Sequence, residues 1–121
     1  MPGNKSVLVV DNEAAIVDVI TETLQDEGYS VLAALAGLDA LQLLQVHRPS
    51  LALIDYHLND IDGLSLLDQI RHIDPIPIVV MTADAGIADH LERQGIARCL
   101  RKPFDLDDLI ACVAHYADRA R

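Results

Sequence analysis

The feature that most constrains this chain is a run of apolar residues that ends abruptly in a carboxylate. Leu51–Ile54 shows no polar alternation and leads straight into Asp55. Such a run is typical of a strand buried on both faces, as in a parallel sheet covered by helices. Removing water from a carboxylate costs several kcal/mol unless a partner compensates. Asp55 is therefore expected at the carboxyl end of its strand, where open α/β sheets bind their ligands.

Similar apolar runs recur along the chain and alternate with segments of helical periodicity. Strands are expected at residues 6–11, 29–34, 51–55, 77–82 and 97–101, and helices at 13–27, 38–47, 63–74, 87–94 and after Asp105, the expected N-cap of the last helix. The helix residues expected to face the sheet are Ile16, Ile20, Leu24, Leu41, Leu44, Leu64, Leu67, Ile70, Leu106, Leu109, Ile110 and Val113. This alternation predicts a doubly wound α/β fold, a five-stranded parallel sheet with five helices on its two faces. A single domain is expected over residues 1–121, with its core at about 6–117.

The charge and composition narrow the class of protein. The net charge of −10 argues against binding nucleic acid through this domain, because phosphate contacts need Lys and Arg, and it suits a protein that holds a cation. Cys99 and Cys112 have neither a CxxC nor a zinc-like spacing, so reduced thiols inside the cell are expected. No apolar run has the length of a membrane span and no signal peptide precedes the first strand, so the expected location is the cytoplasm, away from membranes.

Four of the expected strands end in residues that can carry chemistry: Asp11, Asp55, Thr82 and Lys102. In a parallel sheet these ends share one edge, so the side chains are expected to converge. Two carboxylates held close together repel each other unless a cation lies between them, and Mg²⁺ with its preference for oxygen ligands fits that need. Because Mg²⁺ commonly binds phosphate oxygens as well, a phosphoryl substrate is indicated. An aspartate can be the nucleophile, with the lysine and threonine side chains contacting the phosphoryl oxygens.

The motifs that carry a family resemblance are Val9-Val10-Asp11-Asn12-Glu13, Ile54-Asp55 with Asp62-Gly63, Met81-Thr82-Ala83 and Lys102-Pro103-Phe104. With these motifs in this order, the chain resembles the response-regulator receiver domains of two-component signalling from Val7 to about His115. The resemblance implies a flavodoxin-like fold with strand order 2-1-3-4-5. It also implies that Asp55 accepts a phosphoryl group from a sensor histidine kinase or a phosphotransfer protein, with Mg²⁺, or alternatively Mn²⁺, as cofactor.

The resemblance also implies roles for further residues. Asp11, Asn12, Asp55 and the backbone carbonyl of His57 would form the metal pocket. Thr82 and Lys102 would contact the phosphoryl oxygens, and the Lys102–Pro103 peptide bond would be cis. Two side chains at the mouth of the site, those of His57 and Asp84, would tune the lifetime of the phosphorylated form.

The chain departs from the family pattern at three positions. Asn12 replaces a second acid that commonly binds the metal, which predicts weaker metal binding. Asn59 stands where proline is usual, so the loop after Asp55 is expected to be less stiff. Cys99 occupies the place of an aromatic that usually reports phosphorylation, which puts the coupling of Thr82 to such a ring in doubt.

These observations leave several functions open. The first is a switch in which phosphorylation of Asp55 alters the face made by the fourth helix, fifth strand and fifth helix, and so controls a downstream protein partner or an output domain. The second is a phosphorylation-independent interaction module, suggested by Asn12 and Cys99. The third is a small aspartyl-phosphate phosphatase, disfavoured because His57 stands where such enzymes carry a second acid. A homodimer is also left open.

Overall fold

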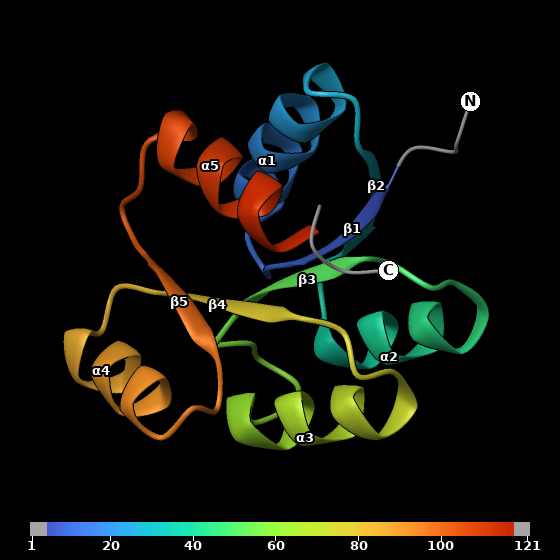
Figure 1. Cartoon of the computed structure of the whole chain (residues 1–121). Coiled ribbons are helices and arrows are strands. Elements are labelled where there is room, and N and C mark those ends of the chain that lie inside the picture. Colours follow the sequence, from blue (N-terminus) through green and yellow to red (C-terminus); the bar gives the residue numbers. More distant parts are fainter. Residues whose placement is uncertain (1–4, 118–121) are drawn as a thin grey trace.

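Five strands form one parallel sheet in the order β2-β1-β3-β4-β5 in the computed structural model, which describes residues 5–117 (Figure 1). The strands are β1 Ser6–Val10, β2 Ser30–Ala34, β3 Leu51–Asp55, β4 Ile78–Thr82 and β5 Arg98–Arg101. The helices are α1 Ala14–Asp26, α2 Gly37–Val46, α3 Gly63–Ile73, α4 Ala85–Arg93 and α5 Leu106–Ala117. The predicted fold class and strand order are confirmed. Residues 1–4 and 118–121 of the predicted domain lie outside the described residues.

The sheet lies between two layers of helices, with α1 and α5 on one face and α2, α3 and α4 on the other (Figure 1). Strand β3 is buried at all five positions, and its side chains pack against the helices on both faces of the sheet. Leu51 and Leu53 pack into the cluster beneath α1 and α5, whereas Ala52 and Ile54 pack into the cluster on the opposite face. Alternate residues thus meet apolar partners on both sides, which explains why the run before Asp55 shows no polar alternation.

Two of the leucines expected to face the sheet are instead exposed. Leu64 is 42% exposed, because the buried stripe of α3 begins one residue earlier, at Gly63, and continues through Leu66 and Leu67. Leu106 is 45% exposed in the first turn of α5, where it lines a surface groove together with Ile16 and Phe104. The predicted N-cap of α5 is confirmed, since Oδ1 of Asp105 accepts a hydrogen bond of 2.8 Å from the Asp108 amide.

Within residues 5–117, none of the helices combines the length and the apolar character needed to cross a lipid bilayer. The longest of them, α1, has 13 residues and an exposed polar face.

Leu53→Ala is expected to lower the free energy of unfolding by about 2–5 kcal/mol, because it leaves a cavity where a fully buried side chain stood. Urea unfolding followed by circular dichroism measures the change. Val46→Ala is the matched control: that side chain is 78% exposed, and its removal is expected to change stability by no more than about 0.5 kcal/mol. Equal losses in the two variants would contradict the assignment of the core.

Candidate functional site

Two carboxylates lie side by side at the carboxyl edge of the sheet. Val10 of β1 pairs with Ile54 of β3, so the residues that follow them, Asp11 and Asp55, are neighbours across the two strands. Both are buried, with Asp11 at 0% exposed and Asp55 at 6%. Thr82, 1% exposed, ends the adjacent strand β4. The parallel register thus brings three polar side chains to one place.

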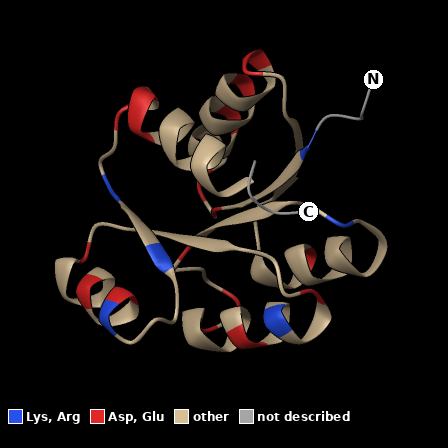
Figure 2. Ribbon diagram, viewed as in Figure 1, with Lys and Arg blue, Asp and Glu red and all other residues tan. Residues whose placement is uncertain are grey.

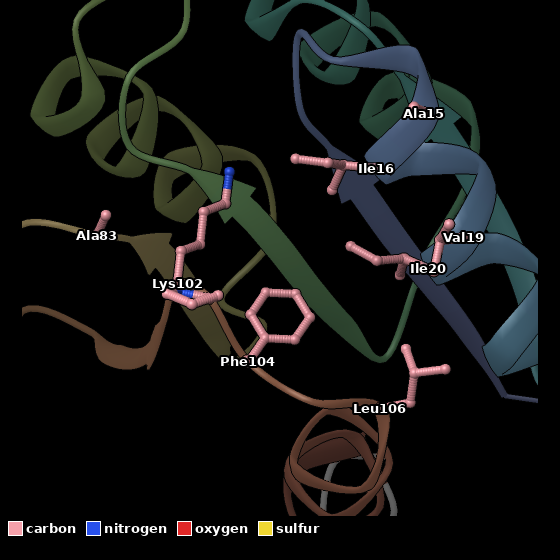
Figure 3. Close-up of a pocket in the computed structure, with 9 residues that line it drawn as sticks. Ala15, Ile16, Val19, Ile20, Ala83, Lys102, Phe104 and Leu106 are labelled. Carbon is pink, nitrogen blue, oxygen red and sulfur yellow. The ribbon is translucent and has the colours of Figure 1, made fainter.

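Lys102 supplies the positive charge that this edge needs. Its Nζ lies 2.8 Å from Oδ2 of Asp11 and 3.6 Å from Oδ1 of Asp55. Figure 3 shows its side chain running from the end of β5 toward the tip of β3. The backbone amide of Lys102 donates to the carbonyl of Thr82 over 2.9 Å, which fixes where the side chain starts. The predicted convergence of Asp11, Asp55 and Lys102 is confirmed, and so is the cis Lys102–Pro103 bond.

Backbone amides hold the polar side chains of the edge in place. Oδ1 of Asp11 accepts from the Glu13 amide over 2.9 Å, and Oδ1 of Asp55 accepts from the His57 amide over 3.3 Å. Because one ammonium faces two carboxylates, the cluster keeps a net negative charge. It is therefore suited to a further cation and, once a cation is bound, to an anionic group.

The donor set fits Mg²⁺ with few protein ligands. The carboxylates of Asp11 and Asp55 offer hard oxygen atoms, the type that Mg²⁺ prefers, and Mg²⁺ commonly takes one or two carboxylates together with waters and phosphate oxygens. Among residues 5–117, no group of three or more His, Cys, Asp or Glu side chains is placed to hold a metal ion. The pocket is thus poorer in acids than a dedicated protein cage.

The other predicted site residues lie around this edge, and their roles stay predictions. Asn12 directly follows Asp11 in the chain, and His57 comes two residues after Asp55; both are exposed. Asp84 has an additional task that the sequence analysis missed: its Oδ1 accepts from the Ile87 amide over 3.1 Å and so caps α4. Its own amide donates to Oγ1 of Thr82 over 3.0 Å. The missed cap followed from placing the start of this helix at residue 87, two residues beyond its observed start at Ala85.

Cys99 lies on β5 against α4, three residues before Lys102. Its Sγ donates to the carbonyl of Ala88 over 3.7 Å, and its amide donates to the carboxylate of Glu92 over 3.1 Å. Burial, with a smaller contribution from the negative charge of Glu92, raises the pKa of the Cys99 thiol to about 11. The side chain is thus a neutral packing group that ties β5 to α4.

An apolar groove beside the site was not foreseen from the sequence. It has a volume of about 550 Å³ and lies between α1 and the segment that links β5 to α5 (Figure 3). Ile16, Val19, Phe104 and Leu106 line it, and Lys102 and Ala83 connect it to the edge of the sheet. Figure 2 shows that α1 and the first turn of α5, the two helices that contribute to the groove, also carry acidic residues. A signal was present, since Val19 is an apolar residue outside the sheet-facing stripe of Ile16, Ile20 and Leu24, and it is 51% exposed.

The fold and this edge together define a doubly wound α/β protein whose functional groups lie at the carboxyl ends of its strands. The family is identified more closely by comparison: the model of the response regulator receiver domain matches residues 7–114, so the chain belongs to that family. It is a receiver domain of two-component signalling, a family whose members are typically switches rather than enzymes.

Relatives and solved structures agree with this assignment. The chain is 31% identical over 116 residues to sporulation initiation phosphotransferase F of Bacillus subtilis (strain 168), covering 93% of this chain and 94% of that protein. It is 30% identical over 110 residues to transcriptional regulatory protein GlrR of Escherichia coli (strain K12), covering 88% of this chain but only 25% of GlrR. It is similar in structure to a response regulator receiver domain protein (CheY-like) from Methanospirillum hungatei JF-1, with a TM-score of 0.88 and 26% identity over 97% of this chain and 96% of that one.

Lys102→Met is expected to lower the free energy of unfolding by about 3 kcal/mol, because it leaves two neighbouring carboxylates buried without a counter-charge. This loss is at the low end of the roughly 3–5 kcal/mol that removing one partner of a buried ion pair costs, since the Lys102 side chain is 18% exposed. Adding Asp55→Asn to that variant is expected to restore part of the loss. Urea unfolding at neutral pH without divalent cations is the measurement, and a Lys102→Met variant as stable as the unsubstituted protein would contradict the expectation.

Both thiols are expected to react slowly in the folded protein. Burial raises the pKa of Cys112 to about 11, as it does for Cys99. Since the thiolate is the reactive form, a rise of about two pKa units predicts alkylation by iodoacetamide about 100-fold slower than in the urea-unfolded chain near pH 8, with the rate increasing as the pH rises. Mass spectrometry of the time course gives both rates, and equal rates would contradict the burial of these thiols.

Proposed function

We propose that this domain is a phosphorylation-controlled switch in which Asp55 accepts a phosphoryl group from the phosphohistidine of a sensor histidine kinase or a phosphotransfer protein. The observation that carries the proposal is the buried Asp55 carboxylate, 3.6 Å from the Lys102 ammonium and beside the Asp11 carboxylate at the ligand-binding edge of the sheet. Family membership and the similarity to a protein named as a phosphotransferase support it.

The proposed reaction is a direct transfer to the aspartate. An oxygen of Asp55 attacks the phosphorus, the bond from phosphorus to the histidine nitrogen breaks, and the nitrogen keeps the electron pair, leaving an acyl phosphate on the protein. The hydrogen bond and ion pair of Asp55 both involve Oδ1, so we assign the attack to Oδ2. Lys102 would stabilise charge on the phosphoryl oxygens, and the hydroxyl of Thr82 would donate to another of them.

Mg²⁺ is the cofactor that the oxygen donors of the edge support, with Mn²⁺ as a substitute. Asp11 and Asp55, with the side chain of Asn12 and the backbone carbonyl of His57, would hold it. When bound, it would neutralise negative charge that develops on the phosphoryl group. Because Asn12 contributes no charge, we expect weaker metal binding than a pocket with three acids would give.

The proposed output runs through α4, because Thr82 is linked to the start of that helix. The Thr82 hydroxyl accepts from the amide of Asp84, and Asp84 caps α4. If the hydroxyl turned toward a phosphoryl group, the amide would lose its acceptor and the first turn of α4 would shift. This route needs no aromatic at Cys99, and it alters the face formed by α4, β5 and α5.

The groove beside Lys102 is the proposed docking surface for the phosphodonor protein. Its apolar walls, on helices that also carry acidic residues, suit a helical partner that presents apolar side chains together with Lys and Arg. A downstream protein partner, or an output domain joined to this one, would respond to the face formed by α4, β5 and α5. The chain spans only a quarter of GlrR, so the nature of that partner is not inferred from GlrR.

A phosphorylation-independent interaction module is the second candidate, and the acid-poor pocket is the observation that favours it. No observation among the described residues favours a phosphatase, because the position two residues after Asp55 is an exposed histidine rather than an acid.

Treatment with beryllofluoride or acetyl phosphate is expected to give a one-to-one, Mg²⁺-dependent adduct that is lost in Asp55→Asn. Mass spectrometry detects the acetyl phosphate product, and ¹⁹F NMR detects the bound beryllofluoride. Asp62→Asn is the control, because Asp62 is an acid in the loop that follows Asp55 and its side chain caps α3. Absence of an adduct at every Mg²⁺ concentration would favour the interaction module, and rapid turnover of an added phosphoester would favour the phosphatase.

A further inference from the structure

The amino end of α2 is capped by a residue that lies far away in the sequence. Ala36, at the N-cap position, provides no side-chain hydrogen bond. Instead, the carboxylate of Asp60 accepts from two amides of the first turn: Oδ1 from Gly37 over 3.0 Å and Oδ2 from Leu38 over 2.9 Å. We call this pair of bonds the Asp60 clasp. The clasp joins the loop between β3 and α3 to the first turn of α2, which lies with α3 on one face of the sheet.

Apolar contacts reinforce the clasp. Gly37 is buried, and a Cβ added there would collide with Cγ2 of Ile61 and lie 3.4 Å from Cδ1 of Leu58. Both of these side chains pack against the hydrophobic cluster beneath α2, α3 and α4. The loop therefore fits closely on the first turn of α2, and Gly37 is required because a larger residue would displace it.

The base of the same loop is fixed separately. A Cβ at Gly63 would lie 2.7 Å from the ring of Tyr56 and 2.8 Å from its carbonyl oxygen, so the two ends of the loop lie in direct contact. Oδ2 of Asp62 accepts from the Ser65 amide over 3.2 Å and caps α3. Of the loop residues between these anchors, Asp60 is the one whose side chain bonds to another element.

The loop also carries atoms of the proposed phosphorylation site. The His57 amide donates to Asp55, and the His57 carbonyl is a proposed metal ligand. Asn59, two residues further on, provides no ring to restrain the backbone. The hydrogen bond from the Leu38 amide, with that from Gly37, holds the pKa of Asp60 below its ordinary value, so the clasp is ionised at neutral pH. The restraint on His57 thus comes from a carboxylate bound to α2.

We propose that Asp60 is a positioning residue, which sets the metal affinity of the site by clasping the β3–α3 loop, and with it the His57 carbonyl, onto the first turn of α2. This inference rests on the proposed function, because it assumes a divalent cation at Asp11 and Asp55. Asp60 does not touch the reacting atoms. Its effect is on the probability that the His57 carbonyl is in place when the metal arrives.

The test is a titration of the folded protein with MgCl₂, followed by the amide shifts of residues 55–61 in ¹⁵N NMR. Asp60→Asn is expected to raise the Mg²⁺ dissociation constant about threefold to tenfold, less than the roughly 10–100-fold typical for residues that bond to a metal ligand directly. Asp60→Ala is expected to have the larger effect, since it removes both acceptors. Beryllofluoride occupancy at saturating Mg²⁺ should be unchanged in both variants.

Two further variants separate position from charge. Gly37→Ala keeps every charge but pushes against Ile61, so it is expected to weaken Mg²⁺ binding as well. Asp39→Asn removes a carboxylate from the same first turn of α2 without touching the loop, and it should leave the affinity unchanged. Hydrogen exchange of the Gly37 and Leu38 amides reports the clasp itself, and is expected to accelerate about tenfold or more in Asp60→Asn.

The outcomes distinguish the inference from the proposed function. Faster exchange at Gly37 and Leu38 in Asp60→Asn with an unchanged Mg²⁺ dissociation constant would overturn the inference, since the clasp would then only cap α2. Equal weakening in Asp39→Asn would overturn it too, because the effect would be one of charge. Absence of Mg²⁺ binding in the unsubstituted protein would overturn the proposed function and this inference together.

Discussion

The Lys102 ammonium between the carboxylates of Asp11 and Asp55 is the interaction on which the rest of the structure depends. The parallel pairing of β1 with β3 forces the two acids together, and without a counter-charge they would repel each other in a buried place. Lys102 reaches them because β5, two positions from β3 and three from β1 in the sheet, ends at the same edge. The order of the strands thus determines which charged side chains meet at the site.

Around this cluster, the loops do more than connect elements. On one side, Thr82 and Asp84 link the site to the first turn of α4, and Cys99 ties that helix to β5. On the other side, Asp60 links the loop after Asp55 to α2. A pocket with few acids depends more on the placement of its remaining oxygen donors. If the proposed cation binds there, the departures at Asn12 and Asn59 and the clasp by Asp60 would bear on the same property, the affinity for that cation.

Much of the fold and site was predictable because the signals are local. Unbroken apolar runs locate strands buried on both faces, and the parallel order then brings the residues at their ends, Asp11, Asp55 and Thr82, to one edge. The phase of a helix is less certain from the pattern alone, which is why Leu64 was assigned to the core in place of Leu66. The cap at Asp84 is also local, and it was missed only because the helix start was placed two residues late.

The sequence by itself determined the α/β alternation, the buried strands and the identities of the residues at the strand ends, since these follow from hydrophobic periodicity and the cost of burying charge. Only the tertiary structure decided which side chains outside the strand ends meet. Asp60 lies 22 and 23 residues from the two amides that it caps, and the groove walls come from α1 and from the start of α5. Such contacts join segments with no periodic relation in the chain, so packing of the helices on the sheet fixes them.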